Sequence, residues 1–170
     1  AAESGNGVHR LLKSLRHDVP ENSQTVVRVG LKEDDDCVVQ VLQTYHTASS
    51  GKMSLVRIWH GVLKDGVSLN GQRVASVNRM LGQTINKVSE ASGGDIVALG
   101  RMDGVKTGDI LSTTGEANPR DLPTAEVLTP IYAFAVKAES RQDEVKLSDA
   151  LQKLVEEDRS LSFEANSETH

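Results

Sequence analysis

The sequence lacks the features that would indicate a secreted or membrane protein. Cys37 is the only cysteine among 170 residues, so no disulfide can form within the chain, and the reducing cytoplasm is the expected compartment. No apolar run reaches the roughly 18 residues of a membrane span, so no membrane partner is expected. No signal peptide with a charged start and an apolar centre is present. The first residue is not Met, and we expect a segment cut from something longer.

Aromatic residues are also scarce, and they are Tyr45, Trp59, Tyr132, Phe134 and Phe163. The core is therefore expected to be aliphatic. Because no aromatic cluster is present, the chain offers no platform on which the bases of single-stranded nucleic acid would stack.

The net charge of −5 argues against broad binding to naked nucleic acid, but the charge is unevenly distributed. Residues 37–95 carry six Lys or Arg against three Asp or Glu, whereas residues 137–170 carry five against nine. The middle of the chain is thus the basic part of an acidic protein, and a local basic patch can bind a partner that the net charge would repel.

The stretch from Gly51 to Gly66 is the centre around which the chain is organised. Its middle alternates with a period of two, as a β-strand does, and Gly51 and Gly61 bracket it. One face carries Met53, Leu55, Arg57 and Trp59, and the other carries Ser54, Val56, Ile58 and His60. Since neither face is fully polar, this strand is expected at the centre of a small, closed β-barrel.

Further strand patterns recur on both sides of this stretch, with turn residues between them. The expected strands are 24–30, 37–44, 53–60, 67–70, 73–80, 84–88 and 95–101. Short strands at this spacing are typical of an antiparallel barrel or sandwich. Asn70-Gly71 gives the best hairpin signal, because both central positions of that turn need a positive φ.

The N-terminal flank predicts a short helix. Asn6 is expected to cap it, and Pro20 to end it. Its apolar stripe consists of Val8, Leu11, Leu12 and Leu15.

The C-terminal flank predicts a β-α-β unit. A linker at 118–123 precedes a strand at 131–136, and a further strand follows at 161–163. The helix between them is marked by Leu147, Ala150, Leu151, Leu154 and Val155. These three elements expose more apolar surface than they can bury alone, so we expect half of a larger α/β domain that is poorly ordered or pairs its strands with a second copy, as a strand-exchanged homodimer would.

The nucleotide motifs are incomplete. A phosphate-binding loop ending at Gly51-Lys52 would need Gly in place of His46 and Ser or Thr in place of Met53. Asn86-Lys87 begins like a guanine-specificity element, but Ser89 stands where that element has Asp. Neither GTP nor another nucleotide is expected to bind this chain alone.

Metal and catalytic motifs are equally weak. Cys37, His46 and His60 match no zinc spacing, and the acidic run 33–36 matches no cation loop. No Gly-x-Ser-x-Gly elbow is present for a serine nucleophile. No metal, cofactor or catalytic residue is therefore expected here.

Basic side chains are the remaining candidates. They are Lys52, Arg57, Lys64, Arg73, Arg79 and Lys87. Such side chains at strand ends and in loops can contact phosphates without reading sequence. By composition alone, a scattered solvated surface explains them equally well.

Several motifs, in order, resemble the translation elongation factor G family, and more closely its paralogues. The stretch 51–66 is similar to the family's second-domain pattern G-K-(L/M)-x-x-x-R-(V/I)-x-x-G-x-(L/V)-K-x-G. Residues 94–98 and 107–111 resemble two later elements of the same barrel. Residues 143–158 resemble the first helix of the third domain, except that Arg159 stands where the family commonly has Pro, and 7–12 looks like the last helix of the GTPase domain.

The resemblance implies a mainly β fold: an antiparallel translation-factor-type β-barrel, with a short N-terminal helix and a C-terminal βαβ half of a ferredoxin-like α/β domain. The implied boundaries are 1–23 for the end of the GTPase domain and its linker, 24–117 for the barrel, 118–129 for a second linker and 130–170 for the partial third domain.

The resemblance also implies a function. The parent would be a multidomain GTPase that uses GTP and Mg on the ribosome, in translocation during elongation or in ribosome recycling. The paralogue-like loop 45–48 leaves that choice open. The barrel would pack on the GTPase domain of the same parent and contact small-subunit ribosomal RNA. The expected contacts are Lys52 and Arg57 first, then Arg73, Arg79 and Lys87.

Two alternatives come from other classes. One is a stand-alone β-barrel interaction module without a ribosomal role. The other is a small hydrolase, which would require activity in this chain itself.

Overall fold

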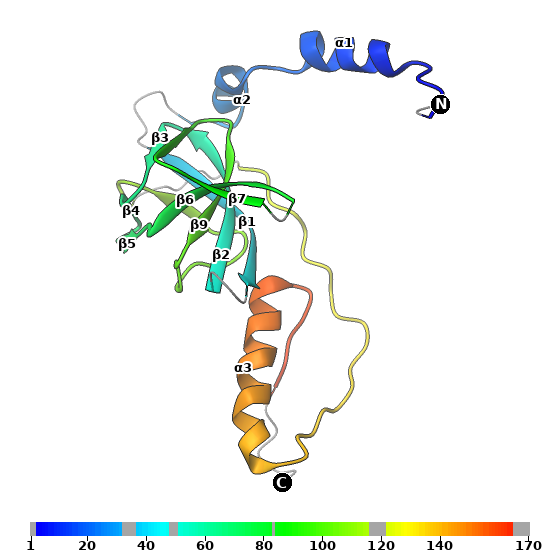
Figure 1. Ribbon diagram of the computed structural model, residues 1–170, viewed down its shortest axis with the longest axis vertical. Coiled ribbons are helices and arrows are strands. Elements are labelled where there is room, and N and C mark those ends of the chain that lie inside the picture. The colour runs from blue at the N-terminus through cyan, green and yellow to red at the C-terminus, as the bar shows by residue number, and fades with distance from the viewer. Residues whose placement is uncertain (1–2, 32–36, 48–50, 83, 116–121, 165–170) are drawn as a thin grey trace.

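The computed structural model describes residues 3–31, 37–47, 51–82, 84–115 and 122–164. Figure 1 shows short N-terminal helices, then a β-barrel and then a long helix, in chain order. The helices are α1 (Val8–Asp18), α2 (Asn22–Arg28) and α3 (Arg141–Glu157). The strands are β1 (Val38–Thr47), β2 (Gly51–His60), β3 (Val62–Lys64), β4 (Ser68–Leu69), β5 (Gln72–Arg73), β6 (Ser76–Leu81), β7 (Thr84–Val88), β8 (Glu90–Ser92), β9 (Ile96–Gly100) and β10 (Ile110–Ser112).

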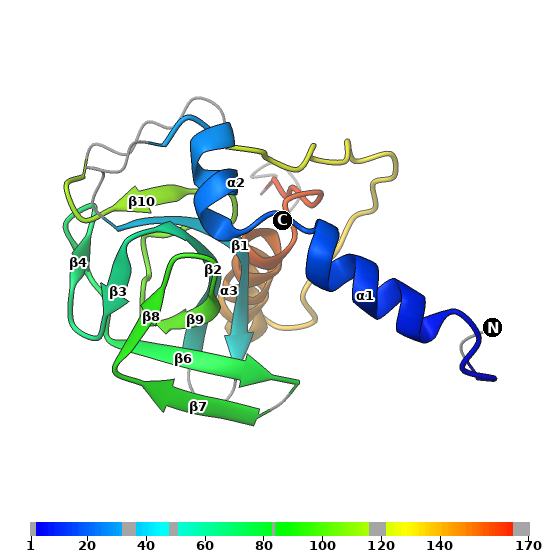
Figure 2. The same ribbon diagram turned by 90° about the horizontal axis from the view of Figure 1, so that it is seen from above.

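The strands pair antiparallel throughout and curl around a common interior (Figure 2). The main sheet has the order β10-β1-β2-β9-β6-β7, and the pairs β3-β8 and β4-β5 complete the wall. The central strand β2 pairs with β1 on one side and β9 on the other. The predicted antiparallel barrel, with 53–60 at its centre, is confirmed.

The barrel interior is aliphatic, as the scarcity of aromatic residues predicts. Val56 and Ile58 of β2 are fully buried in it beside Val39 and Val97 of the neighbouring strands. Burial of each such side chain contributes roughly 1.5–3 kcal/mol. This interior therefore supplies most of the apolar stabilisation of the chain.

A second apolar cluster covers the outer face of β2. Trp59 lies there beneath α2, beside Val26 and Val29. The Asn22 amide of α2 donates a hydrogen bond to the Trp59 carbonyl oxygen at 3.1 Å. With the interior on one face and α2 on the other, β2 is covered on both faces around its end at residues 56–59, as the sequence predicts.

The prediction of a strand at 24–30 is wrong, because these residues form α2 and the turn after it. The β-branched run Thr25-Val26-Val27 favours a strand by local preference. A helix instead places Val26 and Val29, three residues apart, together against Trp59, while Val27 points to solvent. Tertiary packing overrides local preference in this short segment.

Helix α1 forms as predicted and ends before Pro20, but its cap differs. Gly7, with φ 81°, is the N-cap, and the Asn6 amide donates a hydrogen bond to Ser4 Oγ rather than capping the helix. Leu11, Leu12 and Leu15 are all more than half exposed.

Several strand limits differ from the predicted ones. The expected strand 73–80 is interrupted at Val74, whose N–H bonds to the Val67 carbonyl and whose own carbonyl accepts from Gly66. The short break at residues 74–75 separates β5 from β6. The three-residue strands β3, β8 and β10 are too short to show a period of two and were not predicted.

The Asn70-Gly71 hairpin is confirmed. Asn70 has φ 46° and Gly71 has φ 79°, and Leu69 pairs with Gln72 across the turn.

At the C-terminal end α3 forms as predicted, but the strands expected at 131–136 and 161–163 do not. Tyr132 is 82% exposed and Phe134 is 76% exposed. In Figure 1 the segment before α3 runs away from the barrel, and α3 returns to it. A strand needs a neighbouring strand for its backbone hydrogen bonds, and no described segment lies alongside these residues.

A close backbone approach at Gly61 gives a stability prediction. A Cβ there would lie 2.7 Å from Cys37 Cα, whereas a Cβ on Gly71 would have nothing within 4 Å. The two glycines have nearly the same φ, 76° and 79°. We expect Gly71→Ala to lower the free energy of unfolding by about 1 kcal/mol and Gly61→Ala by about 3 kcal/mol, because only the latter adds overpacking.

Urea unfolding of both variants beside the unchanged chain measures the difference. Equal losses in the two variants would contradict the tight contact between the residue-61 backbone and Cys37.

Candidate functional site

Arg57 is the predicted phosphate-binding residue whose surroundings are most unusual. Its guanidinium carbon lies 4.1 Å from the centre of the Trp59 ring. Its Nε is buried without a hydrogen-bond partner, and among the described residues no acidic side chain pairs with it. Trp59 is itself fixed, since its Nε1 donates to Gln40 Oε1 at 3.0 Å. Arg57 is therefore a guanidinium held over an indole without an acidic partner among the described residues.

Arg79, on β6, lies at the start of β9, which is the end of β9 that pairs with Arg57. Its Nη2 is 3.0 Å from Asp95 Oδ2, and the pair is largely exposed. Asp95 directly precedes Ile96, which is the partner of Arg57 in the β2–β9 pairing. Two of the five predicted residues thus flank the start of β9.

Arg73 and Lys87 both lie close to Asp65, at a second site on the barrel surface. Lys87 Nζ lies 2.6 Å from Asp65 Oδ2, and the Lys87 side chain is 62% exposed. Asp65 and Arg73 both line an open hollow of about 440 Å³. No acidic side chain among the described residues pairs with Arg73.

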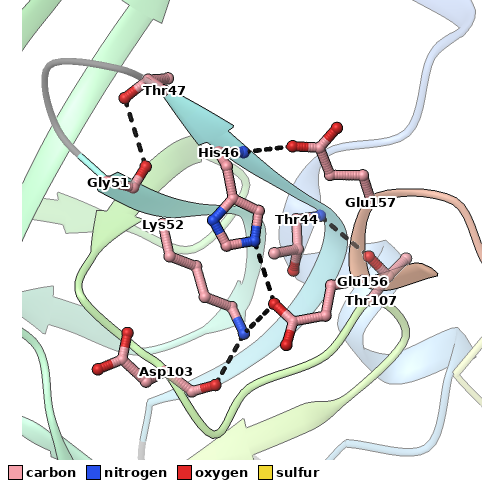
Figure 3. A network of polar contacts seen from close by, with 9 residues as sticks. All are labelled: Thr44, His46, Thr47, Gly51, Lys52, Asp103, Thr107, Glu156 and Glu157. Atoms are coloured by element: carbon pink, nitrogen blue, oxygen red, sulfur yellow. Dashed lines mark hydrogen bonds and ion pairs between the residues drawn. The ribbon is translucent and has the colours of Figure 1, made fainter. Parts of the chain in front are cut away.

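Lys52 lies elsewhere and is not on the open surface. Its side chain is only 6% exposed, and its Nζ donates to the Asp103 carbonyl oxygen at 2.7 Å. The same Nζ is 3.0 Å from Glu156 Oε2 of α3, and His46 Nε2 is 3.1 Å from that same oxygen (Figure 3). The residue expected to lead the phosphate contacts therefore faces a carboxylate of its own chain.

A second carboxylate extends this contact. Glu157 Oε1 accepts a hydrogen bond from the His46 backbone N–H at 2.6 Å (Figure 3). We call His46, Lys52, Glu156 and Glu157 the α3 clamp. It joins the last turn of α3 to the end of the β1–β2 hairpin.

Arg159, the residue that departs from the family pattern, also lies at this junction. Its Nη1 is 2.6 Å from the position that a Cβ on Gly108 would occupy. The absence of a side chain at Gly108 thus makes room for the guanidinium that follows α3.

The clamp is electrostatically favourable for an ionised Glu156. Burial raises the pKa of the Glu156 carboxyl, but hydrogen bonds from Lys52 and His46 and their positive charge outweigh burial, so that the pKa is lowered overall. Glu156 is therefore ionised at neutral pH and acts as the counter-ion of Lys52.

Sequence reasoning did not identify Glu156 and Glu157 as functional residues. The signal that was available is the charge asymmetry between the basic 37–95 and the acidic 137–170, which favours contact between the two. The sequence does not say which carboxylate meets which cation.

The three weak metal candidates do not form one cluster. Cys37 and His60 lie at one end of β1, where Val38 pairs with His60, whereas His46 is near the other end, in the clamp. The acidic run 33–36 lies outside the described residues. In the part of the chain that the structure describes, no three potential metal ligands gather, and no helix has the length and apolarity to cross a membrane.

Two family models match the chain. The one described as Elongation factor G domain 2 matches residues 37–114, and the one described as Elongation Factor G, domain III matches residues 127–170. The first covers the barrel strands, and the second covers α3 and the exposed segment before it.

Curated proteins named Elongation factor G-like protein are similar to this chain over nearly its whole length. An Elongation factor G-like protein of Synechocystis sp. is 46% identical over 171 residues, which are 99% of this chain and 25% of that protein. An Elongation factor G-like protein of Mycobacterium tuberculosis is 28% identical over 92% of this chain, and it too is covered to 25%. This chain spans about a quarter of the length of these relatives.

A solved structure agrees with the fold. A crystal structure of a protein from Thermus thermophilus superposes with a TM-score of 0.77 and 28% sequence identity, covering 96% of this chain and 24% of that one.

The clamp gives a pH prediction. The lowered pKa means that ionised Glu156 stabilises the fold fully above its ordinary value of 4.5, and that this stabilisation is lost as the pH falls through the folded-state pKa. We expect Glu156→Gln to be less stable than the unchanged chain at pH 7, by about 1 kcal/mol. The difference should shrink towards zero as the pH falls below 4.5 and Glu156 becomes protonated.

Thermal or urea unfolding of both proteins at several pH values measures this difference, and the comparison cancels the titration of the other carboxylates. A gap that is the same at neutral and at strongly acidic pH, or no gap at neutral pH, would show that Glu156 is not held by Lys52 and His46.

Proposed function

The chain belongs to the elongation factor G family, and from this premise we propose that it is the non-catalytic central segment of an elongation-factor-G-like translational GTPase. The parent would bind GTP and Mg, hydrolyse GTP in the cytoplasm, and act on the ribosome in translocation or in recycling. Residues 24–117 would be its second domain, 1–23 the end of its GTPase domain, 118–129 a linker and 130–170 the start of its third domain. The domain III match beside the barrel match favours this over a stand-alone interaction module.

The barrel would pack on the GTPase domain of the same parent. Helix α1 would be the part of the GTPase domain that is joined to the barrel, and Leu11, Leu12 and Leu15 form an exposed apolar stripe on it that the rest of that domain would cover. Such a stripe on a short helix is stable only when another surface covers it.

The barrel would also dock on small-subunit ribosomal RNA through phosphate contacts. The observation that carries this proposal is the Arg57 guanidinium, which is fixed over Trp59 and lacks an acidic partner among the described residues. A planar guanidinium without an acidic partner suits a phosphate, and stacking on an aromatic ring limits the side-chain entropy lost on binding.

The other candidates support this contact to different degrees. Arg73 is also without an acidic partner in the described part of the chain. Arg79 and Lys87 are in exposed ion pairs, which are worth little and exchange easily for a phosphate. Lys52 could contact RNA only if α3 moved away from it, because its ammonium is paired with Glu156. These contacts would fix the position of the barrel without reading base sequence.

Ribosome binding by the full-length parent tests this proposal. We expect Arg57→Ala to weaken binding to small ribosomal subunits about tenfold and to reduce the slope of log affinity against log salt by about 1, as the loss of one phosphate contact does. Arg57→Lys, which keeps the charge, should retain the salt slope and recover part of the affinity.

Lys146→Ala is the matched control, since it removes one positive charge from an exposed pair on α3. It should leave both affinity and slope unchanged. If Arg57→Ala behaves like Lys146→Ala, Arg57 does not contact the RNA.

A further inference from the structure

The α3 clamp has the geometry of an occupied phosphate site. Lys52 Nζ and His46 Nε2 converge on one carboxylate oxygen, Glu156 Oε2, at 3.0 Å and 3.1 Å (Figure 3). Two nitrogen donors on a single anionic oxygen is also how proteins hold a phosphate oxygen. Both donors come from the β1–β2 hairpin, so the barrel alone provides the site and α3 provides the anion.

Glu156 is the counter-ion of Lys52 while α3 is docked. The Lys52 side chain is then only 6% exposed, and its other partner is the neutral carbonyl oxygen of Asp103. Helix α3 supplies part of this cover, because its residues line the cleft beside Lys52. If α3 withdraws, Lys52 is opened to solvent without its counter-ion, and its ammonium can contact another anion.

The attachment of α3 is suited to exchange. No α3 residue is buried, so the helix is not held by a large apolar contact. Residues 123–137 before it are exposed and have no regular structure. Polar contacts at a partly exposed junction contribute about 1 kcal/mol each, which a competing ligand can overcome.

A phosphate and α3 would not share the site. The docked helix brings two carboxylates, of Asp149 and Glu156, and one ammonium, of Lys153, to a cleft of about 230 Å³ beside Lys52 and His46. The net negative charge of these α3 side chains disfavours a phosphate while α3 is in place. Removal of α3 leaves the two nitrogen donors facing the opened cleft.

We propose that His46 and Lys52 form a phosphate-binding site for the RNA backbone, that Glu156 occupies this site as an internal competitor, and that docking of α3 and binding of RNA there exclude each other. This rests on the proposed function, because it assumes that the barrel docks on RNA. It assigns Lys52 a contact that exists only after α3 is released, whereas Arg57 is available in both states.

The test compares variants with equal charge changes. Glu156→Gln/Glu157→Gln removes two negative charges at the clamp, and Asp143→Asn/Glu144→Gln removes two at the opposite end of α3. Binding of a fluorescently labelled mixed-sequence RNA duplex is measured by anisotropy for each. We expect the clamp variant to bind about tenfold more tightly than the charge-matched variant, as one added ionic contact of about 1.4 kcal/mol implies.

Lys52 should carry this gain. Adding Lys52→Ala to the clamp variant should abolish the tenfold gain, whereas adding Lys146→Ala, which removes an exposed cation of α3 outside the clamp, should leave the gain unchanged. The His46 backbone ¹⁵N–H signal reports docking, since Glu157 accepts its hydrogen bond. Saturating RNA should move this signal in the unchanged chain to its position in the clamp variant.

The outcomes separate the two proposals. If RNA binds in an Arg57-dependent manner but the clamp variant is no tighter than the charge-matched one, RNA docking stands and the competition is overturned. If RNA binds none of the proteins, both proposals fail. If inorganic phosphate at the same phosphate concentration moves the His46 signal as fully as RNA does, the site binds free anions and the assignment to RNA is overturned.

Discussion

The structure depends on one strand being buried on both faces. Val56 and Ile58 of β2 enter the aliphatic interior, while Trp59 is covered by α2. Because β2 also pairs on both edges, its surroundings fix the barrel, the position of α2 and the orientation of Arg57 over the indole. A change in the register of this strand would exchange its two faces and disrupt all three.

The fold was largely predictable where local pattern and tertiary environment agree. The alternation of 53–60 and the Asn70-Gly71 turn predict their structures because burial and turn geometry both require those residues. The prediction for residues 24–30 is wrong because their β-branched side chains favour a strand, whereas contact with Trp59 selects a helix. The prediction for residues 131–136 is wrong for another reason. A strand also needs a partner strand, and none of the described segments pairs with these residues.

The candidate site was predictable in residue type but not in geometry. Composition indicates a basic middle, yet the five selected cations lie in three separate places, and only contacts distant in sequence distinguish them. Lys52 and Glu156 are more than a hundred positions apart, and no local period connects them. Arg57 illustrates the opposite case, because its two-residue spacing from Trp59 in a strand already places both side chains on one face.

The attachment of α3 at one end has a mechanical consequence. The hydrogen bonds and ion pairs that tie it to the described part of the barrel are in its last turn, while its 17 residues extend about 25 Å to the far end. A rigid rod fixed at one end amplifies rotation, so that tilting by about 10° at the hairpin would displace the opposite end by about 4 Å, from the helical rise alone. Helix α3 can thus act as a lever that pivots at the Lys52–Glu156 ion pair.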